Sequence, residues 1–189
     1  KAIILGSEPV ISDAQLNALS LMGVESERIG GANRYETAAL VSERIDSEGA
    51  VVADGATFKD VSLASVFAAQ HQYPILLSQG NRMPRETTEA MRGRSEIVLA
   101  ADHLSIEART KEEDAKRRVA VLAPASNFTD ALSAATAAAR RNGSLYLVDT
   151  KGLTKELKAQ LAQYESFLLV DSEGQFDAGM IRSLEALVD

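Results

Sequence analysis

Short, unbroken apolar runs alternate with segments of helical period along this chain. In the first half the runs lie at residues 2–5, 50–53, 75–78 and 96–100, and turn residues separate them from the helical segments. An unbroken apolar run is typical of a strand that is buried on both faces, as in a parallel sheet. The alternation of such strands with helices predicts an α/β fold, with mostly parallel sheets between layers of helices.

Capping residues place the ends of several predicted helices. Asn33 precedes a segment of helical period and Glu36 stands three residues later, which predicts a capping box. Ser12 is predicted to cap the preceding helix, and Gly23 is predicted to end it. Pro74 follows an alanine-rich helix that begins near residue 57, and it ends this helix because proline lacks the backbone donor.

The chain repeats its own pattern at a shift of 70 residues. Phe58 corresponds to Phe128 and Asp60 to Asp130, and the predicted elements around them follow in the same order. The start of the chain also matches its end, at a shift of 165 residues. We therefore predict three units: residues 1–22 as the tail of a first repeat, 23–105 as a second repeat, and 106–189 as a third. An array of repeated units favours a binding or structural protein over an enzyme.

The third predicted unit is shorter than the second. It has no counterpart of RIGGANRYETAALV at residues 28–41, and the corresponding stretch is the charged segment EARTKEEDAKRRV. This segment is predicted to be either a helix or a linker between units.

Composition narrows the range of functions. The chain has 189 residues, no cysteine and a net charge of -7. The absence of cysteine excludes disulfides, thiolate metal sites and cysteine nucleophiles. An acidic chain is a poor binder of nucleic acid, because phosphate neutralisation needs an excess of Lys and Arg. No apolar run approaches the roughly 20 residues of a membrane span, so we predict neither nucleic-acid binding nor membrane insertion.

Arginines supply the first candidate chemistry. Arg34 lies just inside a predicted helix, where it can bind a carboxylate or phosphate in bidentate fashion, or pair with Glu36 or Asp60. Arg82 and Arg85 belong to a local basic cluster, whose alternative interpretation is a solvated helix face. The Gly-Gly pair at residues 30–31 precedes the helix of Arg34, so it either cradles an anion or forms a tight turn.

The Phe-x-Asp motif occurs once in each copy, as Phe58/Asp60 and Phe128/Asp130. It is either part of a ligand-binding loop or a structural device. In the structural interpretation the aspartate bonds to the cap of its helix and the phenylalanine anchors the loop in the core.

Catalytic chemistry has weak support in the sequence. His71 and His103 have no metal-like partner at helical spacing. A cluster of Asp54, Asp60 and Asp102 at strand ends would suit a Mg²⁺-dependent phosphoryl enzyme, but Pro124 replaces Asp54 in the second copy. We predict no catalytic residue, no metal site and no cofactor.

Three motifs in order resemble the cell wall binding repeat 2 family. They are RIGGANRYETAALV at 28–41, GATFKDVSLAS at 55–65 and YPILLS at 73–78, and NFTDALSAA at 127–135 resembles the middle motif again. The resemblance implies small three-layer α/β modules, usually three in number and packed around a pseudo-threefold axis. It also implies a secreted bacterial or archaeal surface protein, anchored non-covalently to an anionic cell wall polysaccharide and often carrying an attached effector domain.

The resemblance also implies where the ligand binds. The Pro-Ile-Leu-Leu motif is thought to mark the ligand region of the family, and Arg34 is a plausible anion contact. The predicted ligand-binding residues are Arg34, Tyr35, Asp60, Pro74, Ile75, Leu76, Leu77, Arg82 and Arg85. The chain departs from the family pattern at Lys59 and Val61, where the family favours Pro and Ala, and at residues 144–147, where Ser-Leu-Tyr-Leu replaces Pro-Ile-Leu-Leu.

The sequence therefore predicts a non-catalytic module that anchors a surface protein to the cell wall. Two alternatives stay open. One is a surface-layer or assembly subunit, whose repeats would bind protein and self-associate without any glycan. The other is an α/β enzyme that handles sugars or phosphates.

Overall fold

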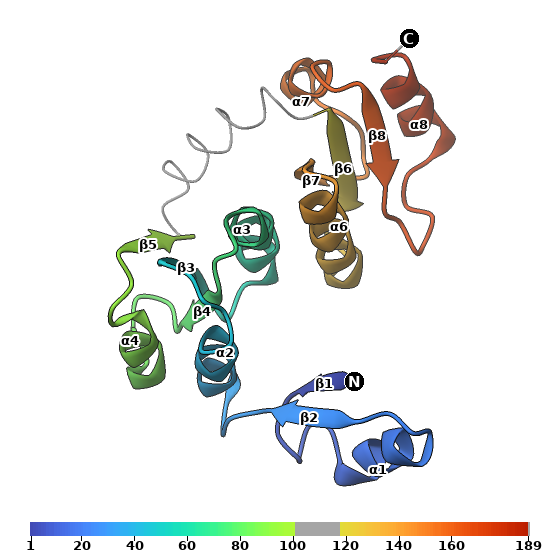
Figure 1. Ribbon diagram of the computed structural model, residues 1–189. Helices are drawn as coiled ribbons and strands as arrows, with labels where there is room; N and C mark the ends of the chain where they lie inside the picture. Colours follow the sequence, from blue (N-terminus) through green and yellow to red (C-terminus); the bar gives the residue numbers. More distant parts are fainter. Residues whose placement is uncertain (101–117, 189) are drawn as a thin grey trace. The chain divides into compact units, whose positions relative to one another are not determined.

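The computed structural model describes residues 1–100 and 118–188, apart from the side chains of Lys59 and Asp60. The chain divides into two compact units. Unit 1 comprises residues 1–56 and 72–99. Its elements are β1 (Ala2–Leu5), α1 (Asp13–Leu21), β2 (Ser26–Ile29), α2 (Arg34–Ser42), β3 (Gly49–Asp54), β4 (Ile75–Ser78), α4 (Arg85–Met91) and β5 (Glu96–Leu99) (Figure 1).

Unit 2 comprises residues 57–71 and 100–189. Its described elements are α3 (Phe58–His71), β6 (Val119–Pro124), α6 (Phe128–Arg140), β7 (Ser144–Val148), α7 (Lys155–Leu161), β8 (Ser166–Leu169) and α8 (Ala178–Glu185) (Figure 1). The predicted helix or linker of the third repeat, at 107–119, lies almost wholly outside the described residues.

The described strands pair in parallel throughout. β3 is the central strand of the order β4-β3-β5, and β6 is the central strand of the order β7-β6-β8. β1 and β2 form a separate two-stranded parallel sheet in unit 1. The predicted α/β class with parallel sheets is confirmed.

The two three-stranded sheets reproduce the 70-residue repeat. β6 runs from 119 to 124 where β3 runs from 49 to 54, and β8 runs from 166 to 169 where β5 runs from 96 to 99. The register agrees as well, since Val51 faces Ile75 and Val121 faces Leu145. The apolar runs therefore predicted the position of the strands, and the structure adds their order and register.

Unit 2 has helices on both faces of its sheet. Alternate side chains of β6 point to opposite faces: Ala120 and Leu122 pack with residues of α7 and α8, whereas Val121 and Ala123 pack with residues of α3 and α6. α3 lies against α6, whose alanines Ala134 and Ala138 are fully buried. Small side chains let these two helices approach closely.

Three local predictions are wrong. Phe58 and Phe128 do not anchor their loops in the core; they are 41% and 53% exposed, and their rings meet edge to face at 6.0 Å. Asp130 is buried but does not bond to its cap, because its Oδ2 accepts a hydrogen bond from the N–H of Ser172 at 3.1 Å. Ser12 occupies the cap position of α1, but its side chain makes no capping hydrogen bond.

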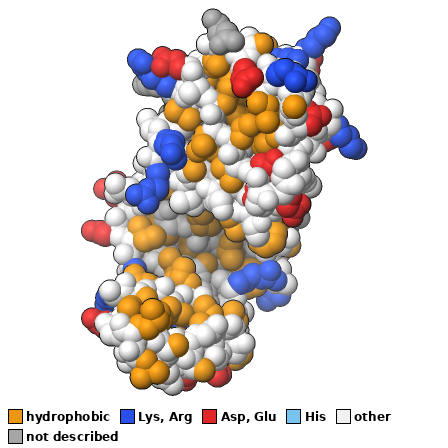
Figure 2. Space-filling view, turned by 90° about the vertical axis from the view of Figure 1, so that its right-hand side faces the viewer, with side chains coloured by type: hydrophobic (Ala, Val, Ile, Leu, Met, Phe, Trp, Pro, Cys, Tyr) orange, Lys and Arg blue, Asp and Glu red, His pale blue; other side chains and the backbone are white. Residues whose placement is uncertain are grey.

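The N-terminal part of unit 1 exposes many apolar side chains. α1 has no buried residue, and Ile3, Leu5 and Leu21 are 60%, 54% and 91% exposed. Hydrophobic side chains are visible on this part at the bottom of Figure 2. Its hydrophobic pattern follows the repeat, but the described residues leave much of its apolar surface uncovered.

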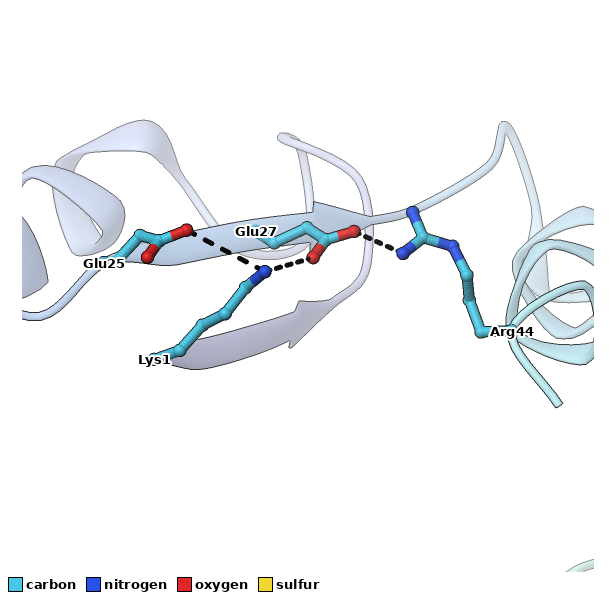
Figure 3. Close-up of polar contacts among 4 residues, drawn as sticks. All are labelled: Lys1, Glu25, Glu27 and Arg44. Carbon is cyan, nitrogen blue, oxygen red and sulfur yellow. Dashed lines mark ion pairs between the residues drawn. The ribbon is translucent and has the colours of Figure 1, made fainter.

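Ion pairs connect β2 to its surroundings in unit 1. Glu27 accepts from Lys1 at 2.9 Å and from Arg44, which follows α2, at 2.6 Å, while Glu25 lies 3.8 Å from Lys1 (Figure 3). The hydrogen bond from Lys1, followed by that from Arg44, lowers the pKa of Glu27 below its ordinary value. These groups are exposed, so their contribution to stability is small and sensitive to salt.

Candidate functional site

The N-terminus of α2 is closed by its own side chains. Asn33 Oδ1 accepts from the N–H groups of Tyr35 and Glu36, both at 2.9 Å, as the capping prediction required. Glu36 reaches back to the N–H of Ala32, and Thr37 Oγ1 accepts from the N–H of Gly31 at 3.0 Å. Because side chains of this helix already occupy these donors, the Gly-Gly pair is a tight turn, not an anion cradle.

Arg34 projects from the first turn of α2 toward the end of β3. Its Nη1 donates to the carbonyl of Gly55 at 2.9 Å, and its guanidinium lies 5.5 Å from the centre of the Tyr35 ring. Arg34 is exposed, and among the described side chains it makes no ion pair. Glu36, one predicted partner, is used in capping, and the side chain of Asp60, the other, lies outside the described part of the chain.

Gly55 is the point at which several candidate residues come together. A Cβ atom at this position would lie 3.4 Å from Tyr35 Cε1 and from the Ser78 carbonyl oxygen, and 3.5 Å from Leu77 Cβ. Three predicted site residues, Arg34, Tyr35 and Leu77, therefore meet around this glycine. We refer to Arg34, Tyr35, Asp54, Gly55 and Leu77 as the Arg34 edge; it lies at the carboxyl ends of β3 and β4, where ligands of parallel α/β folds usually bind.

Asp54 joins the two strand ends of the Arg34 edge. Its Oδ1 accepts from the N–H of Ala56 at 3.0 Å and from the N–H of Gly80 at 3.2 Å. These two backbone hydrogen bonds, with a smaller contribution from Arg34, lower the pKa of Asp54 below its ordinary value. The carboxylate thus holds the loop after β4 against the end of β3.

The Pro-Ile-Leu-Leu motif forms the start and body of β4. Pro74 and Leu76 are fully buried, and Leu76 packs with Ala50 and Val52 of β3. Ile75 and Leu77 are partly buried on the other face of the strand. Leu77 reaches the Arg34 edge, whereas Pro74 and Leu76 support it from inside the sheet.

The remaining predicted arginines lie beyond β4. Arg82 pairs through its backbone with Gln79, which closes a turn around Gly80, and its side chain is exposed. Arg85 is on the surface of α4, 86% exposed, with Nε bonded to Glu89 Oε1 at 2.8 Å, one turn away. The solvated-face interpretation describes Arg85 well, while Arg82 lies in the loop that Asp54 holds.

Arg94 has a structural role in unit 1 that the sequence did not predict. Its guanidinium donates to the carbonyl oxygens of Ala90, Ser42, Ser47 and Gly49, and to the hydroxyl of Ser47, at 2.8–3.1 Å. It fills one side of an open depression of about 380 Å³ at the carboxyl ends of α2 and α4. No local signal marked it, because all its partners except Ala90 lie 45 to 52 residues away in sequence.

The structure offers little support for catalytic chemistry. His71 stacks on Phe67 with ring centres 4.0 Å apart and bonds through Nδ1 to the Phe67 carbonyl. Across residues 1–100 and 118–188, no three His, Asp or Glu side chains are placed to hold a metal ion, although Asp102 and His103 fall outside this range. Within the same residues, no helix combines the length and hydropathy of a membrane span.

The fold and the Arg34 edge define a repeated α/β module that presents an arginine and an aromatic ring at its strand ends. Residues 28–100 match the family model described as cell wall binding domain 2 (CWB2). This part of the chain belongs to that family and is a cell wall binding module. The match includes α2, the Pro-Ile-Leu-Leu strand and Arg94, and so contains the whole Arg34 edge.

Two relatives from Bacillus subtilis (strain 168) share part of the sequence. The N-acetylmuramoyl-L-alanine amidase LytC is 32% identical over 91 residues, which cover 48% of this chain and 18% of the amidase. An amidase enhancer is 34% identical over 83 residues, covering 43% of this chain and 12% of the enhancer. The chain therefore matches only a small part of each relative.

Solved structures extend the likeness of the fold to the full length. Cwp8 from Clostridium difficile aligns with 100% of this chain and 38% of its own, with a TM-score of 0.76 and 19% identity. Cwp6 from the same organism aligns with 99% of this chain and 36% of its own, with a TM-score of 0.79 and 17% identity. At these identities the likeness concerns the fold alone.

Proposed function

We propose that this chain anchors a surface protein to the cell wall by binding an anionic polysaccharide at the Arg34 edge. The observation that carries this proposal is the position of Arg34, exposed at the strand ends, beside an aromatic ring and in no ion pair with a described side chain. A guanidinium in this position has donors left for a carboxylate or phosphate group of the polymer. Tyr35 offers an amphipathic ring next to that charge.

Asp54 and Arg82 give the Arg34 edge its shape in this proposal. Asp54 holds the loop after β4 in place, and that loop carries Arg82. Arg82 would be a second cationic contact for the polymer, besides Arg34 on α2. Two cations on a fixed loop and a fixed helix suit a polymer with regularly spaced anionic groups. The net charge of -7 makes the binding depend on this local pair, because the molecule as a whole repels anions.

The wider biological setting is part of the same proposal. The chain acts without catalysis, and in the full-length protein it is joined to an effector domain that is secreted to the cell surface. The amidase and amidase-enhancer relatives support this setting, since each is longer than the shared segment. We also propose residues 23–105 and 106–189 as the repeat units in sequence, with 1–22 as the end of a preceding one.

Co-sedimentation with isolated Gram-positive cell walls tests the proposed function. The 189-residue chain is mixed with walls before and after mild acid removal of the anionic polymer, at low and high salt. We expect binding that is lost with the polymer and weakens with salt, because exposed charge pairs are screened. Equal binding to stripped walls, or sedimentation of the chain by self-association alone, would refute the anchoring proposal and favour the assembly alternative.

Variants then locate the binding site. Arg34→Gln is expected to weaken wall binding roughly tenfold, since it removes the charge and the bidentate donors. Arg34→Lys keeps the charge but loses the planar guanidinium and its paired donors, so we expect intermediate binding. Arg118→Gln is the matched control, because it makes the same charge change at an exposed arginine of unit 2 that pairs with Glu165. Similar losses for Arg34→Gln and Arg118→Gln would show that only net charge matters.

A further inference from the structure

β8 is one of the two edge strands of the described sheet in unit 2. Its only partner among the described strands is β6 (Figure 1). The Ser166 N–H donates to the carbonyl of Arg118, the residue before β6, at 3.2 Å, and the Val170 N–H donates to the carbonyl of Leu122 in β6 at 2.9 Å. Alternate residues of a strand turn their backbone groups to opposite sides. The N–H groups of Phe167, Leu169 and Asp171 therefore face the side that carries no described strand.

The same edge is occupied in the N-terminal copy of this element. β1 and α1 correspond to β8 and α8 at a shift of 165 residues, with α1 starting at 13 and α8 at 178. Ala2 and Gly6, the counterparts of Phe167 and Asp171, donate from their N–H groups to carbonyls of the segment 25–29, both at 2.8 Å. β2 thus binds in parallel to the edge of β1 that β8 leaves open.

One side chain secures β2 in its place. Arg28 of β2 donates from Nη1 to the carbonyl of Gly6 at 2.7 Å and from Nη2 to Asp13 Oδ1 at 3.0 Å. A Cβ atom at Gly30 would lie 2.4 Å from the backbone of Gly6 and Ser7, so only glycine fits after Ile29. The recognition pattern of the added strand is therefore Arg-Ile-Gly.

Acidic side chains follow β8 in unit 2, where the arginine of an added strand would lie. Asp171 stands at the position of Gly6; its Oδ2 accepts from the N–H of Phe176 at 2.7 Å. Its Oδ1 is buried and has no hydrogen-bond partner within the described part of the chain. Glu173 and Asp177 are exposed nearby in the same loop. A guanidinium that arrives at the carbonyl of residue 171 would meet negative charge instead of the neutral glycine of the N-terminal copy.

We propose that the open edge of β8 binds a parallel Arg-Ile-Gly strand, supplied as the first strand of another repeat unit. The four-strand order would be β7-β6-β8 followed by the added strand, with Leu169 opposite its arginine, as Ile4 is opposite Arg28. Strand addition of this kind combines backbone hydrogen bonds, which give affinity, with side-chain contacts, which give specificity. It also protects an edge that would otherwise promote aggregation.

A synthetic peptide tests this inference on the intact chain. The probe is a fluorescent peptide with the sequence of residues 24–33, VESERIGGAN, titrated into the 189-residue protein and followed by anisotropy. We expect saturable binding that falls roughly tenfold or more when the peptide carries Arg28→Glu or Gly30→Val. A peptide of the same composition in reversed order serves as the control. The absence of saturable binding, or equal binding of the reversed peptide, overturns the proposal.

Variants of the protein locate the peptide at β8. Asp171→Asn keeps the shape and the acceptor for Phe176, and is expected to weaken binding of the Arg28 peptide because it removes the negative charge. Asp171→Arg should recover binding of the Arg28→Glu peptide relative to the original peptide. Binding that ignores both changes would place the peptide elsewhere and overturn the proposal.

Disulfide formation tests the register directly, because the chain has no cysteine of its own. Leu5 faces Ile29 in the N-terminal copy, so Val170 is expected to face the same peptide residue. Val170→Cys should form a disulfide with the Ile29→Cys peptide and not with the Arg28→Cys peptide, whose side chain points to the opposite face. Equal cross-linking of the two peptides overturns the parallel register.

Discussion

The β4-β3-β5 sheet of unit 1 and the β7-β6-β8 sheet of unit 2 have the same topology and register, yet they distribute side-chain volume in opposite ways. In unit 1 a small residue, Gly49, faces the Tyr73 ring, and a Cβ on the glycine would lie 2.3 Å from it. At the corresponding positions of unit 2 the order is reversed, with Val119 and Gly143. The repeat has reversed which of the two positions carries the larger side chain, and the valine of unit 2 is smaller than the tyrosine of unit 1.

A second pair shows a change from polar to apolar packing. Arg94 of unit 1 bonds to a ring of carbonyls at the ends of α2 and α4. Its counterpart in unit 2, Tyr164, is 3% exposed, belongs to the apolar cluster around Leu122, and pairs through its hydroxyl with Tyr146 at 3.1 Å. The same backbone fold therefore accommodates a hydrogen-bonded arginine at position 94 and a buried tyrosine at the equivalent position 164.

The candidate binding groups differ between the units as well. Asp54 of unit 1 corresponds to Pro124 of unit 2, so the carboxylate that holds the loop after β4 has no counterpart. A proline at the end of β6 keeps the strand but cannot accept those hydrogen bonds. The comparison teaches that the fold of the repeat tolerates these exchanges, whereas the Arg34 edge depends on residues that the described part of unit 2 does not have.

The largest expected effect follows from placing the arginine of position 94 at the equivalent position 164. Tyr164→Arg should destabilise unit 2 by about 3–5 kcal/mol, because it buries a charge among apolar side chains without the carbonyl ring of unit 1. Tyr164→Phe, which loses the hydroxyl and its bond to Tyr146, should cost about 1 kcal/mol. Urea unfolding followed by circular dichroism measures both. If Tyr164→Arg lowers stability no more than Tyr164→Phe does, the environments of residues 94 and 164 are interchangeable, which contradicts the comparison.

The reversed pair should show coupling between its two members. Gly49→Val is expected to destabilise unit 1 by about 1–3 kcal/mol, because the new side chain overlaps the Tyr73 ring. Tyr73→Gly loses the ring and its bond to Glu96, which spans 2.7 Å. The double variant, which copies unit 2, should recover about 1–2 kcal/mol relative to the sum of the single changes. Additive losses in thermal unfolding would show that volume is not exchanged between the two positions.

A smaller effect is expected at Thr87, whose counterpart in unit 2 is Leu157. Thr87 is fully buried and its hydroxyl donates to the carbonyl of Leu77 at 2.6 Å. Thr87→Val should destabilise unit 1 by about 1–2 kcal/mol, because that carbonyl loses its donor. Thr88→Val, at a neighbouring position that faces solvent, is the matched control and should change stability by less than about 0.5 kcal/mol. Equal effects would remove the distinction between the two threonines.

The smallest expected effect is a pH dependence at Asp54. Backbone hydrogen bonds from Ala56 and Gly80 hold its pKa below the ordinary value of 3.8. The folded state therefore favours the charged form, so this stabilisation is present at neutral pH and is lost as the pH falls through the lowered pKa. Asp54→Asn should unfold more easily than the original chain at pH 7, and the difference should shrink below about pH 4. Thermal midpoints measured from pH 3 to 7 would contradict this if the difference stayed constant.

Local patterns predicted the secondary structure closely. The 70-residue shift placed β6 and β8 close to their observed bounds, and the Asn33 cap was identified from its position and from Glu36 three residues later. The candidate site was predicted in part, because Arg34, Tyr35 and Leu77 meet at Gly55. The exposure of Phe58 was not predicted, because an apolar residue in a motif does not reveal which side of its element is covered.

By itself the sequence determined the α/β class, the order and bounds of the repeated elements, and the membership of residues 28–100 in a cell wall binding family. These properties depend on apolar periodicity, capping and short motifs, each of which acts within a few neighbouring residues. Only the tertiary structure decided which distant groups meet: Arg94 with the carbonyls after α2, Asp54 with Gly80, and β2 with β1 instead of β3. Such contacts depend on how the chain returns to itself over tens of residues, and no local pattern encodes that path.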